Sequence, residues 1–71
     1  MAESMPEWQN AKWGMYLYAP YNRDFTQAMK DMVPQDERKW ENDKKGWWIS
    51  DAWIDDVDTL LMDHYEGYEG A

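Results

Sequence analysis

The absence of cysteine from a chain of only 71 residues is the strongest constraint on how this protein folds. Without thiols the chain forms no disulfide, no zinc–thiolate site and no cysteine nucleophile. A domain of fewer than about 70–80 residues usually needs such a staple or a partner, because its apolar core is small. The chain instead contains six Trp, five Tyr and one Phe. We therefore expect one small domain that is held together by large aromatic side chains.

Two segments have the patterns of β-strands. Side chains alternate with a period of two over residues 11–19, which predicts a strand that ends before Pro20. Further along, aromatic and β-branched residues flank a polar, turn-forming stretch, which predicts a β-hairpin of residues 38–41 and 46–50. In this register the face toward the core carries Trp13, Met15, Leu17, Trp40, Trp47 and Ile49.

Two further segments have the periodicity of amphipathic helices. Asn22 is the predicted N-cap of a helix over residues 23–33, and Pro34 stops this helix. Ser50 is the predicted N-cap of a second helix, whose apolar residues recur at helical spacing as far as Gly67, the expected C-cap. The order β-α-β-β-α predicts an α+β domain with a three-stranded antiparallel sheet and two helices on one face.

The chain divides into three parts by composition. Residues 1–10 are polar and aperiodic and predict a flexible leader, residues 11–66 a single α+β domain, and residues 67–71 a frayed C-terminus. No apolar run approaches the roughly 18 residues of a membrane span, and no signal peptide is recognisable. We therefore expect a protein of the cytoplasm that has no membrane contact.

Negative charge is concentrated at one end of the sequence. The formal net charge is −8, and residues 51–71 contain seven acidic residues and no Lys or Arg. Such an asymmetry predicts a directed electrostatic surface, although a merely solvated acidic face is the simpler interpretation. The candidate partner-binding surface is the outer face of the second helix, with an apolar anchor inside an acidic rim: Asp51, Asp55, Asp58, Met62 and Glu66.

The sheet face away from the helices is the alternative binding surface. The predicted register places Tyr16, Tyr18 and Trp48 there, with Lys39 and Glu41 beside them. Exposed aromatic rings on a sheet suit either a protein interface or stacking on the bases of a single strand. The third interpretation is a small second core, which Trp8 of the leader would cover.

Residues for catalysis are scarce. The chain has no Gly-rich phosphate loop, and its single histidine, His64, lies on the apolar arc of the second helix. The run Asp55-Asp56-x-Asp58 lacks the spacing of a calcium loop. We therefore expect no enzymatic activity, no cofactor and no metal site.

The hairpin carries a family signature. Between Arg38 and Trp47, basic residues and an aromatic residue precede an acidic turn, and Lys-x-Trp returns on the next strand. Upstream, Pro20-Tyr21-Asn22 precedes Phe25, and Ser50 begins the following helix. These motifs resemble the HARP (HepA-related protein) domain over residues 13–65. The resemblance implies the same three-stranded sheet with two helices, in a module that helps DNA-annealing helicases engage branched DNA.

These observations lead to two expectations about function. The first is a small acidic binding protein, a DNA mimic that occludes the basic nucleic-acid site of a nuclease, a CRISPR effector or a uracil-DNA glycosylase. It would resemble phage-encoded inhibitors that act in the host cytoplasm and evade host defence. Its partner would be a basic nucleic-acid-handling protein rather than nucleic acid itself. The alternative is a free-standing HARP-like accessory module that binds branched or single-stranded nucleic acid through Tyr16, Tyr18 and Trp48. A monomer and a homodimer both remain open.

Overall fold

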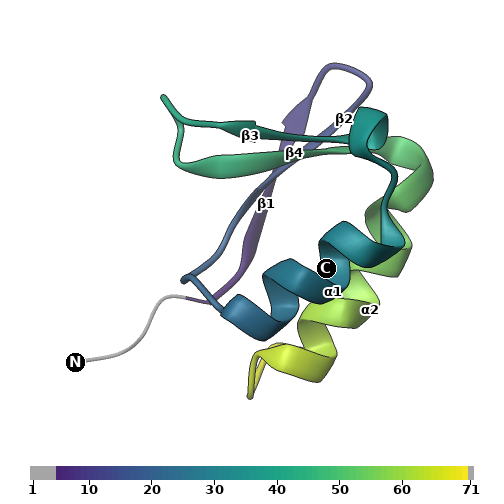
Figure 1. Ribbon diagram of the computed structural model, residues 1–71. Helices are drawn as coiled ribbons and strands as arrows, with labels where there is room; N and C mark the ends of the chain where they lie inside the picture. The colour runs from purple at the N-terminus through teal and green to yellow at the C-terminus, as the bar shows by residue number, and fades with distance from the viewer. Residues whose placement is uncertain (1–4, 71) are drawn as a thin grey trace.

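A computed structural model describes residues 5–70 and shows an α+β fold with four strands instead of three (Figure 1). The elements in chain order are β1 Glu7–Ala11, β2 Gly14–Tyr18, α1 Arg23–Met32, the short 3-10 helix η1 Gln35–Glu37, β3 Arg38–Glu41, β4 Gly46–Ser50, the 3-10 helix η2 Asp51–Trp53, and α2 Ile54–His64.

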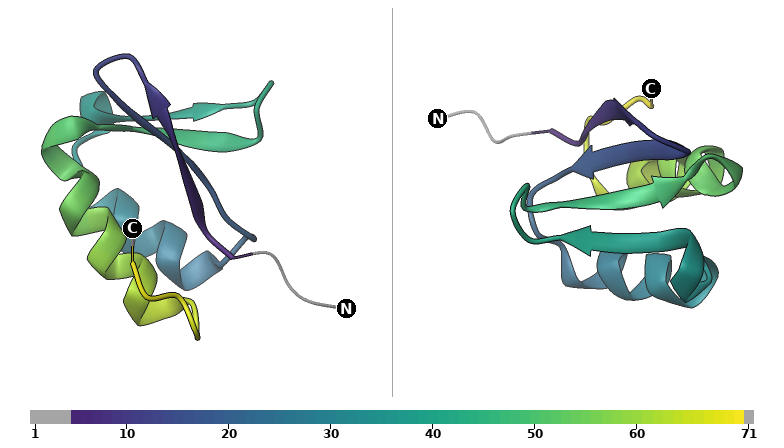
Figure 2. Two further views of the ribbon diagram at one scale, coloured as in Figure 1. Left: turned by 180° about the vertical axis from the view of Figure 1, so that it is seen from behind. Right: turned by 90° about the horizontal axis from the view of Figure 1, so that it is seen from above.

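The strands form one antiparallel sheet in the order β1-β2-β4-β3. Both helices lie on one side of this sheet, and the other side is uncovered (Figure 2). The α+β class and the one-sided helices are confirmed. The predicted hairpin is confirmed as well, with β3 and β4 at the expected positions.

The prediction of three strands is wrong because it misses β1. Residues 7–11, most of them assigned to a flexible leader, pair with β2 through a turn at Lys12 and Trp13. The predicted strand over residues 11–19 is too long, because the observed strand β2 begins only at Gly14. A Cβ at Gly14 would lie 2.1 Å from the carbonyl oxygen of Ile49, so the close approach of β2 to β4 requires glycine there. Residues 1–4 of the predicted leader lie outside the described residues.

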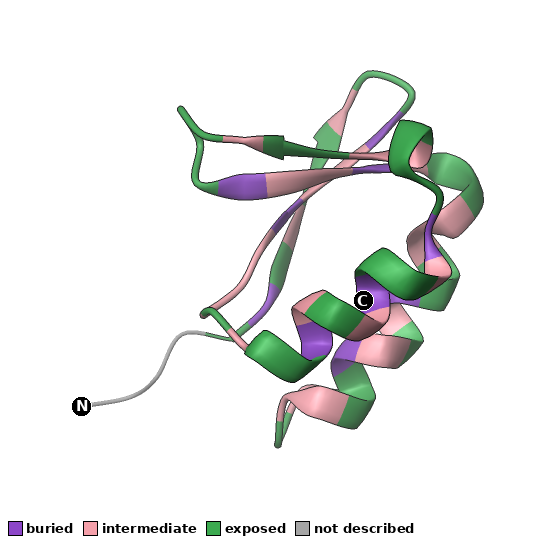
Figure 3. Cartoon of the chain, viewed as in Figure 1, coloured by how far each residue is buried: buried purple, intermediate pink, exposed green. Residues whose placement is uncertain are grey.

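The core lies between the sheet and the two helices (Figure 3). It contains seven buried apolar residues: Leu17, Phe25, Met29, Val33, Ile49, Val57 and Leu61. Two residues that were predicted to face the core, Trp13 and Trp40, are exposed. Trp13 lies in the β1–β2 turn and is 74% exposed, and Trp40 is 45% exposed although it is on the same side as Trp47. Trp40 is less covered because β3 is an edge strand with a neighbour on one side only.

Local signals set the ends of α1. The Phe25 N–H donates to Asn22 Oδ1 at 2.9 Å, which confirms the predicted N-cap. The Val33 N–H donates to the Met29 carbonyl at 2.8 Å, and Pro34 prevents a further turn.

The second helix is shorter than its apolar pattern predicts. Ser50 Oγ accepts from the Ala52 N–H at 3.4 Å, so Ser50 caps η2, which leads into α2. The helix ends at His64, and Gly67, with φ of 88°, lies in the turn that follows. Beyond it Tyr68 packs against the core, so this residue does not fray as predicted.

Candidate functional site: an acidic helix face and an aromatic sheet face

Four exposed acidic residues lie along α2 and just beyond its end. Asp55, Asp56 and Asp63 are exposed, and their separations of seven and eight residues bring them to the same side of a 3.6-residue helix. Glu66 is exposed in the turn that follows the end of the helix at His64. We call these four residues the acidic face of α2. Asp51, in η2, is exposed just before it. The predicted binding surface includes Asp51, Asp55 and Glu66 and does not name Asp56 and Asp63.

Asp58 does not belong to this face. Its Oδ1 accepts one hydrogen bond from Trp8 Nε1 at 3.0 Å and another from the Tyr68 hydroxyl at 2.5 Å. The placement of Asp58 on the solvent arc of the helix is therefore wrong. A half-buried carboxylate between β1 and the C-terminal segment holds three parts of the chain together, which is a structural role.

The Tyr68 hydroxyl responds to this environment. Burial, the hydrogen bond to Asp58 and the negative charge of that carboxylate raise the pKa of Tyr68 to about 12. The Tyr65 hydroxyl donates to the Pro20 carbonyl, and burial raises its pKa as well. In its neutral form Tyr65 thus connects the end of α2 to Pro20, and neutral Tyr68 connects the C-terminal segment to Asp58 on α2.

Met62 is exposed as predicted, but its surroundings differ. It is 42% exposed. A Cβ at Gly70 would lie 3.3 Å from Met62 Sδ and 3.1 Å from Asp58 Oδ2, so the C-terminal segment runs beside both side chains. Met62 therefore sits at the border between the acidic face and this segment, and not in the middle of an acidic ring.

Trp13 is an exposed aromatic residue that the sequence pattern placed in the core. Its φ of 65° is in the left-handed region, which is costly for residues other than glycine. Its carbonyl accepts from the Asp51 N–H at 3.1 Å, which places the turn beside the start of η2 and α2. Neither burial nor backbone preference accounts for tryptophan at this position. The alternation over residues 11–19 concealed it, because a turn interrupts that alternation.

The uncovered sheet face carries the predicted aromatic residues. The register pairs Tyr16 with Trp48, and Tyr18 lies on the same side. The Tyr16 and Tyr18 ring centroids are 6.4 Å apart. All three side chains are half-buried. Trp8 lies opposite Leu17 on the helix side, so the proposed second core beneath Trp8 is wrong.

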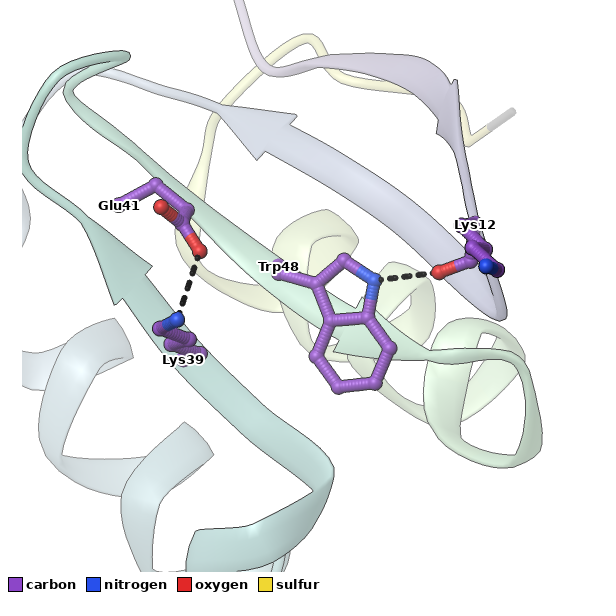
Figure 4. A network of polar contacts seen from close by, with 4 residues as sticks. All are labelled: Lys12, Lys39, Glu41 and Trp48. Atoms are coloured by element: carbon purple, nitrogen blue, oxygen red, sulfur yellow. Dashed lines mark hydrogen bonds and ion pairs between the residues drawn. The ribbon is translucent and has the colours of Figure 1, made fainter.

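Polar contacts border these rings. Figure 4 shows Trp48 between the Lys12 backbone and the Lys39–Glu41 ion pair. Trp48 Nε1 donates to the Lys12 carbonyl at 3.0 Å, and Lys39 Nζ lies 3.4 Å from Glu41 Oε2. On the same face Lys44 Nζ lies 5.0 Å from the Tyr16 ring centroid, at cation–π distance. The aromatic sheet face, defined as Tyr16, Tyr18 and Trp48, thus has lysines around it, whereas the acidic face has none on its own helix.

The single histidine is part of the packing. The His64 ring is half-buried and meets Phe25 edge to face, with centroids 6.2 Å apart. Within residues 5–70 no group of three or more His, Asp or Glu side chains is placed to hold a metal ion. Over the same residues, none of the helices has the length and apolar character needed to cross a membrane.

Comparison with known proteins identifies no relative. No protein-family model, no curated protein and no solved structure matches the chain. The resemblance to the HARP domain therefore stays a prediction from short motifs.

Proposed function

We propose that this protein is a small non-enzymatic binding protein that acts as a DNA mimic. The acidic face of α2 would occupy the basic nucleic-acid site of another protein. The observation that carries the proposal is the grouping of three exposed carboxylates on one side of a helix that has no Lys or Arg, with a fourth, Glu66, just beyond its end. Asp63 lies seven and eight residues beyond Asp56 and Asp55, which is about 10–12 Å along the helix axis. A DNA strand carries one phosphate per roughly 3.4 Å of axis, so this separation is close to that of phosphates about three positions apart.

Trp13 supports this proposal by supplying an apolar anchor. Binding energy at interfaces is concentrated in a few aromatic or Arg residues, while surrounding charges steer the encounter. An exposed indole beside Asp51, at the beginning of the acidic helix, matches that arrangement. The partner would be a basic enzyme of the nuclease, CRISPR effector or uracil-DNA glycosylase type, met in the host cytoplasm if the protein is phage-encoded.

The test uses capture from a bacterial lysate, followed by release with duplex DNA. A DNA mimic releases its partner when duplex DNA competes for the same site. Surface plasmon resonance with the identified partner then compares two fourfold variants of equal charge. Neutralising the acidic face with D55N/D56N/D63N/E66Q should slow association and flatten its salt dependence. The control variant D24N/D31N/D36N/D43N neutralises four carboxylates that are exposed elsewhere on the surface, and it should change the association and dissociation rates much less. Equal effects of the two variants would overturn the proposal.

The second candidate function is a HARP-like accessory module that binds branched or single-stranded nucleic acid. The lysines around the aromatic sheet face favour it, because stacking surfaces for single strands combine aromatic rings with positive charge. Fluorescence anisotropy with oligo(dT) and with a forked duplex separates the two functions. Mimicry predicts no binding of either DNA at micromolar protein. Salt-dependent binding that Tyr16→Ala abolishes would instead establish the accessory module.

A further inference from the structure

The strand β3 is an open edge of the sheet. The strand order ends at β3, and no other described strand lies on its outer side. Natural edge strands are protected by shortness, charged side chains, Pro, bulges or a covering element, because their unpaired backbone groups otherwise pair with another chain. The four residues Arg38–Glu41 contain no Pro, and they pair with β4 in a continuous register without a bulge. The protection of this edge is its shortness and its charged side chains, so a further strand fits only if it places opposite charges against them.

The sequence of this edge is complementary to itself. Suppose that a second copy adds antiparallel, with Trp40 opposite Trp40 of the second copy. Lys39 then lies opposite Glu41 of the second copy, and the two-fold axis repeats this pair. Directly opposite side chains in an antiparallel pair lie about 4.5–5.5 Å apart at Cβ, and opposite charges there are favourable. A register centred on Lys39 would instead place Lys39 opposite itself, so charge selects the register centred on Trp40.

The two faces of the sheet agree with this register. Lys39 and Glu41 both point to the uncovered side, while Trp40 points to the helix side together with Trp47. Pairing on one continuous sheet keeps opposite residues on the same side. The ion pair between Lys39 and Glu41 within one chain is largely exposed, with the Lys39 side chain 70% accessible. Because exposed pairs of this kind contribute little, exchanging this contact for one between two copies costs little.

Trp40 provides the apolar centre of the contact. Its ring meets Trp47 edge to face, with centroids 5.5 Å apart, yet it remains 45% exposed. It borders a groove of about 440 Å³ that Tyr21, Thr26, Lys30 and Trp47 also line. A second Trp40 placed against this edge covers exposed indole on both copies. A central aromatic pair inside a ring of charges is a typical hot-spot arrangement.

We propose that two copies of this chain form a two-fold symmetric dimer in which their β3 strands pair antiparallel and extend the sheet across both copies. The contact between Asp58 on α2 and Trp8 on β1 places α2 toward the opposite edge of the sheet. Dimerisation therefore leaves the acidic face of α2 exposed, and the dimer is independent of the proposed function. Four residues on each side make a small interface, so the dimer is weak and reversible.

Sedimentation velocity over a range of protein concentrations tests the dimer with charge-swap variants. Lys39→Glu and Glu41→Lys should each raise the dissociation constant at least about tenfold, because each places like charges opposite each other. Glu41→Lys makes the net charge less negative, so the weaker repulsion between whole molecules would by itself strengthen association. Arg23→Glu, at an exposed position on α1, matches the net charge of Lys39→Glu and should have much less effect.

Restoring the pair gives the decisive result. The double variant K39E/E41K should recover the dissociation constant of the unchanged protein to within about threefold. An equimolar mixture of the two single variants should also associate better than either variant alone, because unlike charges again lie opposite each other. Circular dichroism confirms that each variant is folded. A chain that stays monomeric at millimolar concentration, or a double variant that stays as weak as the single ones, would overturn the proposed dimer.

Discussion

Replacing Asp58 by Ala should destabilise the fold, although Asp58 lies on the same acidic helix as solvent-exposed carboxylates. The change leaves Trp8 Nε1 and the Tyr68 hydroxyl without their acceptor. Hydrogen bonds to charged groups contribute about 1.5–3 kcal/mol each. All three side chains are half-buried, so the lower value applies to each of the two bonds. Removing one negative charge from an acidic helix relieves repulsion and offsets a few tenths of a kcal/mol of this loss. We therefore expect the free energy of unfolding to fall by about 2–3 kcal/mol.

Such a loss is large for a domain of this size. At roughly 0.05–0.15 kcal/mol per residue, the whole chain has a free energy of unfolding of about 4–10 kcal/mol. In a domain of 60–100 residues, each kcal/mol lost from the free energy of unfolding lowers the midpoint of thermal unfolding by about 4–8 °C. The midpoint should therefore fall by about 10–20 °C in Asp58→Ala. Urea titration followed by tryptophan fluorescence gives the same free energy at 25 °C.

The matched control is Asp63→Ala, which removes the same side chain from the same helix. Asp63 is exposed in the last turn, where a carboxylate opposes the helix dipole. Its replacement should be neutral or slightly stabilising. Tyr68→Phe combined with Asp58→Ala should cost less than the sum of the two changes, because both remove the same hydrogen bond. If Asp58→Ala and Asp63→Ala shift the urea midpoint equally, the role assigned to the Asp58 contacts is wrong.

Three further predictions concern the fold. Gly14→Ala should cost more than about 3 kcal/mol in urea titration, because a Cβ meets the Ile49 carbonyl oxygen at 2.1 Å and the backbone cannot yield easily. Folding raises the pKa of Tyr68 from 10.0 to about 12, so the neutral hydroxyl stabilises the fold below pH 10, and this stability is lost between pH 10 and about 12. The urea midpoint should therefore fall less over this pH range in Tyr68→Phe than in the unchanged protein. Trp47→Ala should cost about 3 kcal/mol but Trp40→Ala clearly less, because Trp40 is 45% exposed; equal losses would contradict the observed burial.

Part of the candidate site could be predicted because strands alternate with a period of exactly two residues. Once residues 14–18 and 46–50 are recognised as strands, alternation places Tyr16, Tyr18 and Trp48 on one face of the sheet and Leu17 and Ile49 on the other face. This holds whichever strands are neighbours. Acidic residues could be expected on the outer side of the second helix for a related reason, since helical spacing separates apolar from acidic residues. The expected exposure of Asp58 is wrong, because the pattern shows which side is apolar but not what covers the border between the sides.

The elements that could be predicted from the sequence are those whose signals are local. Asn22 and Pro34 delimit α1, and the polar turn between residues 41 and 46 delimits the β3–β4 hairpin, because caps, prolines and turns act on their immediate neighbours. The remaining features depend on contacts between segments that are distant in the sequence. Trp8 and Asp58 are 50 residues apart in sequence, yet their contact removes Asp58 from the acidic face. The pairing of β1 and the exposure of Trp13 likewise depend on how distant segments pack, and no local pattern encodes that packing.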